Sequence, residues 1–330
     1  MIEKVRKEKT IKVKTPKVKV DFSKDDIKTK MKYIFMGNNE KKGLIEKIVC
    51  YALLILFGFV YLYPMLYMLA YSFMSPSDVV NPLVNYFPTS WYFTNYVEAA
   101  QALSYGKTLL QTLVEAVAPA IFQTASTMLV AYGLARFEFK GKKIIFGCII
   151  LTFIVPQQIT MIPQIMLFKD LGLLDSLLSF IVPAAFGQGI KSAVFILIFY
   201  QFFSAIPKSV EEAAKIDGAT SLQIFWKVGI PTALPAIILS FLLSVVWYYN
   251  ETVLSAIYFG SEWTTLPLEL AKLQASYEAI FGTASTTGKS INDAIYMAGT
   301  LLSIIPLLFL FFFTQRFFVD GIDKAGITGE

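Results

Sequence analysis

The sequence contains no histidine and only two cysteines among its 330 residues. Histidine is the commonest general base and metal ligand near neutral pH, so its absence excludes two large classes of site. Cys50 and Cys148 lie far apart in apolar segments, which argues against a disulfide framework or a thiolate metal site. We therefore expect no metal or cofactor in this chain and little capacity for enzymatic chemistry.

Charge is also scarce, at 16% of residues, whereas 55% are hydrophobic and the mean hydropathy is +0.58. This composition predicts a membrane protein in contact with a lipid bilayer. The net charge of +5 is concentrated in a lysine-rich arm, residues 1–44, before the first apolar run. Such an arm next to a span is typical of the cytoplasmic side or of contact with anionic lipid, and we expect no nucleic-acid partner.

Six apolar runs are long enough to cross a bilayer as helices, since about 20 residues suffice. They lie near residues 45–73, 108–135, 143–168, 177–203, 232–259 and 294–318. The fold class expected is therefore an all-α polytopic membrane protein with six transmembrane helices. The permease domain would cover residues 45–318, and residues 319–330 would form a short tail.

Positive charges between the runs predict the orientation. Lysine and arginine crowd two connections, around Arg136–Lys143 and Lys208–Lys227, and the other connections carry fewer positive charges. Because short cytoplasmic loops carry the excess of lysine and arginine, both termini are predicted to be cytoplasmic in a bacterial cell membrane. The long connection 260–293 would then lie outside the cell.

The segment FGTASTTGKS, residues 281–290, looks like a phosphate-binding loop. It has one residue more between Gly282 and Gly288 than that loop allows, and no buried strand precedes it. On the predicted topology it lies outside the cell, where ATP is absent. We interpret it as a polar loop and expect that this chain does not bind ATP.

Proline and polar residues interrupt several spans, which favours a polar pathway over an inert anchor. The interrupting residues are Pro64, Glu115, Pro119, Pro156, Gln157, Gln158, Pro163, Pro183, Pro235, Asn250 and Glu251.

The connection at residues 204–231 is too polar for a span and predicts two short helices on the membrane surface. Pro207 and Ser209 favour the start of the first helix, and acidic residues follow in its first turn. Asp217-Gly218 ends that helix, and SLQIFWKV predicts the second.

This stretch resembles the EAA loop of bacterial ABC import permeases, in which Glu-Ala-Ala precedes a glycine and, further on, Ile-x-Leu-Pro. The matching positions are Glu212, Ala213, Ala214 and Gly218, with Val228, Ile230 and Pro231 as conservative replacements at the end of the pattern. An interfacial amphipathic helix pair would explain the polarity but not this residue pattern. The resemblance implies that these residues, with Glu211 and Asp217, couple the permease to an ATPase.

From about residue 45 to its end, the chain is similar to the smaller membrane subunit of maltose-type carbohydrate permeases. AYGLARFEFKGKK, IVPQQITMIPQIMLFKDLGLLDS and QRFFVDGIDKAGITGE carry this similarity. The chain departs from the pattern in its basic arm, in WYYNE where a Trp-Asn pair is commoner, and in its last residues.

The resemblance implies a set of partners. They are a homologous second permease subunit, two ATPase subunits that bind ATP and magnesium, an extracellular solute-binding protein, and a carbohydrate substrate. The connection 260–293 would contact the binding protein. The chain would be a transport permease and not itself an enzyme.

Candidate substrate-pathway residues combine aromatic rings, amides and a carboxylate, the groups that sugar sites favour. They are Gln157, Gln158, Trp247, Tyr248, Tyr249, Asn250 and Glu251. Three alternatives remain: a permease of the same type for a non-sugar solute, an ion-coupled secondary transporter, and a membrane enzyme using Glu115 or Glu251 as an acid. Internal repeats typical of secondary transporters are not evident, and the two acids form no paired motif.

Overall fold

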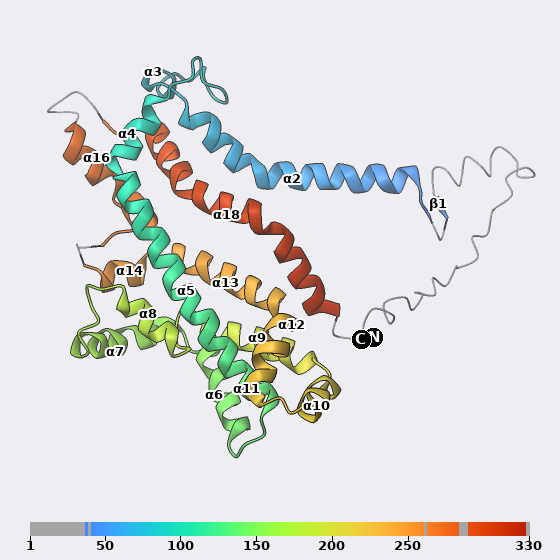
Figure 1. Ribbon diagram of the computed structural model, residues 1–330. Coiled ribbons are helices and arrows are strands. Elements are labelled where there is room, and N and C mark those ends of the chain that lie inside the picture. Colours follow the sequence, from blue (N-terminus) through green and yellow to red (C-terminus); the bar gives the residue numbers. More distant parts are fainter. Residues whose placement is uncertain (1–36, 39–40, 261–262, 284–289, 328–330) are drawn as a thin grey trace, which may run out of the picture. The chain divides into compact units, whose positions relative to one another are not determined.

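The computed structural model describes residues 37–38, 41–260, 263–283 and 290–327 (Figure 1). Most of the basic arm and the centre of the FGTASTTGKS segment lie outside the described residues. The chain divides into two units, Met1–Leu66 and Tyr67–Glu330, which are described separately.

The first unit contains a minimal hairpin and most of a long apolar helix. Strands β1 (Gly37–Asn38) and β2 (Lys41–Lys42) pair antiparallel, with Gly37 opposite Lys42. Helix α2 (Leu44–Ser72) begins here and continues into the second unit. None of the side chains in its most apolar stretch is buried within the chain. Such a surface is suited to lipid or to another membrane helix.

The described secondary structure of the second unit consists of helices joined by loops. Its elements are α3 (Pro76–Val79), α4 (Thr94–Ala102), α5 (Tyr105–Arg136), α6 (Lys142–Ile154), α7 (Gln157–Asp170), α8 (Leu178–Ala185), α9 (Ser192–Ala205), α10 (Lys208–Ile216), α11 (Ser221–Ile224), the π-helical turn η1 (Phe225–Gly229), α12 (Ile230–Thr232), α13 (Leu234–Tyr249), α14 (Val253–Tyr258), α15 (Leu266–Ala271), α16 (Leu273–Phe281) and α18 (Asp293–Ile327). The all-α prediction is thus confirmed, apart from the two-residue strands.

Three described helices are each long and apolar enough to cross a membrane: α2, α5 and α18 up to Arg316. Three further pairs pass the same test but are bent, α6 with α7 by 103°, α9 with α10 by 68°, and residues 221–232 with α13 by 73°. The described residues therefore contain three spans, or up to six if each bent pair counts as one. The expected number of six spans is not confirmed.

Proline and glycine explain where the expected spans break. Val155 precedes Pro156 and is extended, because proline disfavours the α conformation in the residue before it. The expected span 177–203 is divided into α8 and α9 by residues 186–191, in which Gly187 and Lys191 have positive φ. The expected connection 260–293 contains two helices, α15 and α16.

Helix α5 is the centre of the second unit and packs against α8, α9 and α13 (Figure 1). Small residues on α5 permit this close approach, since Ala116, Ala120 and Ala131 are completely buried. Aromatic side chains from the neighbouring helices fill the space around them, including Phe199, Phe203 and Tyr248.

A buried polar cluster joins α5 and α13 to the break between α8 and α9. Gln123 of α5 donates from Nε2 to the Ile190 carbonyl at 2.7 Å, and its Oε1 accepts from the Tyr248 hydroxyl at 2.6 Å. The Ile190 N–H in turn donates to the Tyr248 hydroxyl at 3.2 Å. Backbone groups freed by the break are thereby satisfied inside the protein.

We predict that Gln123→Leu lowers the stability of the purified protein, because it leaves the Ile190 carbonyl without a donor and the Tyr248 hydroxyl without an acceptor. Loss of a buried partner costs about 1–3 kcal/mol. Thermal unfolding in detergent, followed by tryptophan fluorescence, measures the change. Gln101→Leu, at an exposed glutamine of α4, is the control. Equal midpoints for the two variants would contradict the structural role of the cluster.

Candidate coupling surface and substrate pathway

The first half of the polar connection is a short helix followed by Asp217 and Gly218, as the sequence predicts. Pro207 precedes α10, Glu211 lies in its first turn, and Asp217 follows its last residue. Gly218 has φ of 82°, a left-handed conformation that favours glycine. A Cβ atom added there would meet nothing within 4 Å, so only the backbone conformation requires glycine.

The second half begins with a capping box and passes into a π-helical turn. The Thr220 hydroxyl accepts from the Gln223 N–H, and the Gln223 side chain accepts from the Thr220 N–H. Phe225 in η1 is 3% exposed, and its ring lies 4.7 Å from that of Tyr132 on α5 and 6.5 Å from that of Phe203 on α9. This aromatic cluster attaches the connection to the membrane helices.

An ion pair makes a second attachment, between the end of α5 and helix α10. Arg136 Nε lies 2.9 Å from Glu211 Oε1, and the two side chains are only 6% and 13% exposed. Arg136 also donates from Nη2 to the carbonyl of Ile206, the residue that ends α9, at 2.8 Å. One guanidinium therefore joins α5, α9 and α10.

A second ion pair nearby is exposed. Lys142 lies 2.9 Å from Glu138, whose side chain is 89% exposed, and its hydrogen bond lowers the pKa of the Glu138 carboxyl. Pairs of this kind contribute little to stability.

The nine expected coupling residues lie together on this connection but differ in exposure. Those exposed are Glu212, Ala213, Asp217, Gly218 and Pro231, and those partly buried are Glu211, Ala214, Val228 and Ile230. The exposed surface of α10, α11 and η1 also carries large apolar side chains: Val210, Ile216, Leu222 and Trp226. We call the exposed members of both sets the coupling surface.

Sequence reasoning did not assign Arg136, Phe225 or the exposed apolar residues to this site. Arg136 is the basic residue at the end of a predicted span, but its pairing with Glu211 depends on the distance between two helices. The apolar residues could have been found, because an amphipathic helix with exposed apolar residues is typical of a contact surface.

The expected pathway residues of α13 divide between the protein interior and its surface. Tyr248 and Tyr249 are buried, and the Tyr249 hydroxyl donates to the Ser303 carbonyl of α18 at 2.7 Å. Trp247 is partly exposed, with its ring 5.0 Å from that of Phe195 on α9. Tyr248 and Tyr249 thus have packing roles, whereas Trp247 retains accessible surface.

The polar residues after α13 stabilise the chain locally. Asn250 is exposed and its side chain donates to the Val246 carbonyl at 2.8 Å. Glu251 accepts from the backbone N–H groups of Val253 and Leu254, each at 3.0 Å, which caps the start of α14.

Gln157 and Gln158 are exposed at the bend between α6 and α7. Among the described residues, no hydrogen bond connects their side chains to the polar residues of α13. Helix α7 instead approaches that region through Met161 and Ile165, which pack against the cluster containing Tyr248. The substrate-pathway assignment of the seven residues stays a prediction.

Glu115 of α5 is completely buried and accepts a hydrogen bond from the Ser255 hydroxyl. Glu251 serves as a helix cap. The two acids that the enzyme alternative requires are therefore engaged in structural contacts.

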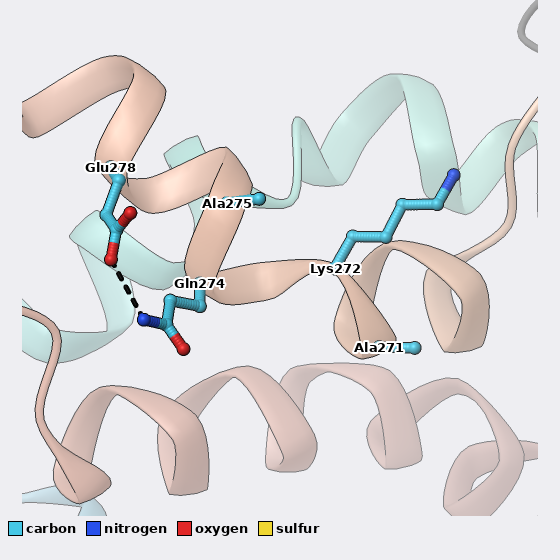
Figure 2. A pocket seen from close by; sticks show the side chains of 5 residues that line it. All are labelled: Ala271, Lys272, Gln274, Ala275 and Glu278. Carbon is cyan, nitrogen blue, oxygen red and sulfur yellow. Dashed lines mark hydrogen bonds between the residues drawn. The ribbon is translucent and has the colours of Figure 1, made fainter.

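At the other end of the second unit, α15 and α16 border a shallow open pocket. Its lining consists of Ala271, Lys272, Gln274, Ala275 and Glu278. Figure 2 shows Gln274 donating to Glu278, at 2.9 Å, while Lys272 extends away from that pair. Exposed polar groups around small side chains suit a protein contact better than an enclosed small-molecule site.

The helices and the coupling connection define an integral membrane permease. Comparison with known proteins gives the same class. Residues 123–324 match the family model described as "Binding-protein-dependent transport system inner membrane component". More than half of the chain is covered. The chain therefore belongs to this family, whose members are permease subunits located in the membrane and not enzymes themselves.

Individual relatives cover nearly the whole chain. The polygalacturonan/rhamnogalacturonan transport system permease protein YtcP of Bacillus subtilis is 29% identical, over 87% of this chain and 100% of its own length. The arabinooligosaccharides transport system permease protein AraQ of the same species is 27% identical, over 82% and 91%. A solved bacterial ABC transporter involved in import of the acidic polysaccharide alginate has a matching chain with a TM-score of 0.71, 28% identity and coverage of 83% and 96%.

We predict that Arg136→Met destabilises the protein far more than Lys142→Met. Loss of one partner from a buried ion pair costs about 3–5 kcal/mol, and the slight exposure of this pair favours the lower end. The exposed Lys142–Glu138 pair contributes little to stability. Unfolding midpoints of the two variants measure the difference, and exchanging the charges, Arg136→Glu with Glu211→Arg, should restore part of the loss. Similar midpoints for both methionine variants would show that the buried pair is dispensable.

We predict that Gly218→Val loosens the turn between α10 and α11, whereas Gly218→Asn has a smaller effect. A β-branched residue in the left-handed conformation costs on the order of 1–3 kcal/mol, and asparagine tolerates that conformation better. Limited trypsin digestion after Lys215, which lies in the last turn of α10, reports the local change. Equal digestion rates for valine and asparagine would refute the conformational requirement.

Proposed function

We propose that the chain is the membrane-spanning permease subunit of an ATP-driven importer that translocates an oligosaccharide delivered by an extracellular binding protein. The observation that carries this proposal is the coupling surface. It combines the Glu-Ala-Ala pattern, a left-handed glycine and exposed apolar residues on two short helices. Family membership implies an ATPase and a solute-binding protein as partners.

The coupling surface is suited to a mechanical contact with an ATPase. Exposed Ala213 permits close approach, Glu212 offers a charged hydrogen-bond acceptor, and Trp226 offers a large apolar anchor. Because Arg136 and Phe225 attach this connection to α5 and α9, a displacement of α10 would move the membrane helices with it.

We assign the coupling surface to the cytoplasm, with both termini on the same side, from the lysine and arginine in the connections beside it. The α15–α16 end then faces outward, where its open polar surface would contact the binding protein. A second, homologous permease subunit would cover part of the exposed apolar surface of the helices, and two ATPase subunits would supply ATP hydrolysis.

The substrate assignment rests on the relatives. YtcP and AraQ are named for transport of pectic and arabinose-containing saccharides, and the alginate importer carries an acidic polysaccharide. These substrates share a carbohydrate backbone and differ in charge, so we propose an oligosaccharide for this chain.

The test is cross-linking from the coupling surface, in a background in which the exposed Cys50 and Cys148 are replaced by alanine. We expect Ala213→Cys to cross-link to the ATPase in native membranes. The matched control is Ala271→Cys, which is also exposed but lies at the α15–α16 end. This cysteine should form no cross-link to the ATPase, and it should be labelled by a membrane-impermeant thiol reagent added outside the cell. Uptake of oligosaccharide should require both ATP and the binding protein. Absence of the Ala213 cross-link together with ATP-independent uptake would refute the proposal.

A further inference from the structure

A lysine lies in the break between α8 and α9. Residues 186–191 connect these helices, and Lys191 adopts φ of 54°, a backbone conformation that residues other than glycine rarely use. Lys191 immediately precedes α9, and its side chain is exposed. The sequence pattern did not draw attention to this residue, because it was expected within a continuous span.

The hydrogen bonds of the neighbouring residue place this break deep in the membrane. Ile190 is bonded through its carbonyl to Gln123 and through its N–H to Tyr248. Gln123 lies about 27 Å from the Tyr105 end of α5 and about 20 Å from the Arg136 end, at 1.5 Å per residue. The hydrocarbon layer is about 30 Å thick, so the backbone of Lys191 lies well inside it.

A lysine at this depth requires a polar partner or a water-filled cavity, since a charge facing lipid is costly. Within the described part of the chain, Lys191 takes part in no ion pair with a carboxylate. Its ammonium instead lies 4.7 Å from the ring centroid of Trp247, the accessible aromatic residue of α13. The contact orients the cation and leaves its charge uncompensated.

Other groups nearby fit a saccharide. Gln188, three residues before Lys191 in the same segment, is exposed and offers an amide. The start of α9 adds the partial positive charge of a helix N-terminus. An aromatic ring, an amide and a cation together match the apolar face, hydroxyl groups and carboxylate of an acidic sugar.

We propose that Lys191, Trp247 and Gln188 form a site on the translocation pathway that binds the carboxylate of a uronic-acid unit. This inference rests on the proposed function and narrows its substrate class to acidic oligosaccharides. Lys191 pairs with the carboxylate, Trp247 provides surface for the sugar ring, and Gln188 hydrogen-bonds to hydroxyl groups. An acidic residue of the second permease subunit is the competing partner for Lys191, and the experiment distinguishes the two.

The experiment compares two disaccharides that differ only at C6, which is a carboxylate in digalacturonate and a hydroxymethyl group in digalactose. The transporter is purified through a tag on this chain and placed in nanodiscs, and the binding of each disaccharide is measured by isothermal titration calorimetry. We expect the unsubstituted Lys191 protein to bind digalacturonate at least tenfold more tightly than digalactose. Lys191→Met should weaken digalacturonate binding at least tenfold and leave digalactose unchanged, whereas Lys191→Arg should stay within threefold. Lys107→Met, at an exposed lysine near the start of α5, is the control.

Four results would overturn the inference alone. One is equal binding of the two disaccharides before any change at Lys191. Another is an equal effect of Lys191→Met on both. The third is loss of the second permease subunit from the purified Lys191→Met complex, which would assign the lysine to that interface. ATP-dependent uptake of digalactose alone would also overturn it while leaving the proposed function intact, whereas ATP-independent uptake would remove both.

Discussion

The second unit depends on the requirement that every backbone polar group inside a membrane finds a partner within the protein. The break between α8 and α9 exposes such groups, and Gln123 of α5 and Tyr248 of α13 satisfy those of Ile190. These bonds fix the break against the two helices that form most of the core. Without them an irregular segment at this depth would be unfavourable, and with them the segment can carry polar side chains beside the helices.

The same central helix also reaches the coupling connection. At its end, Arg136 contacts α10 and Ile206, the residue that follows α9, while Tyr132 packs against Phe225 of η1. Helix α5 thus contacts the break through Gln123 and the coupling connection through Arg136. A rigid helix with attachments at both places provides a direct physical link between them, which suits a protein that must relate events at a surface to events inside the membrane.

Much of the fold could be predicted from the sequence because it depends on local chemistry. Apolar runs predict the spans, Asp217-Gly218 predicts a turn, and SLQIFWKV predicts the short helix that follows it. The break in the fourth expected span was missed because the segment 186–191 is short and lies between two apolar segments. The Arg136–Glu211 pair and the burial of Tyr248 depend on helix packing, which joins residues distant in sequence. Hydropathy alone could not distinguish one bent span from two short helices.

The π-helical turn at Phe225–Gly229 has a consequence for variation of this chain by insertion and deletion. A π turn holds one residue more than an α turn, and each residue rotates a helix by about 100°. Deleting one residue from η1 could convert it into α-helix without breaking the chain, and α13 would then present a different face to α5 and α9. Natural variants of this connection should therefore not carry a one-residue deletion between Ile224 and Ile230.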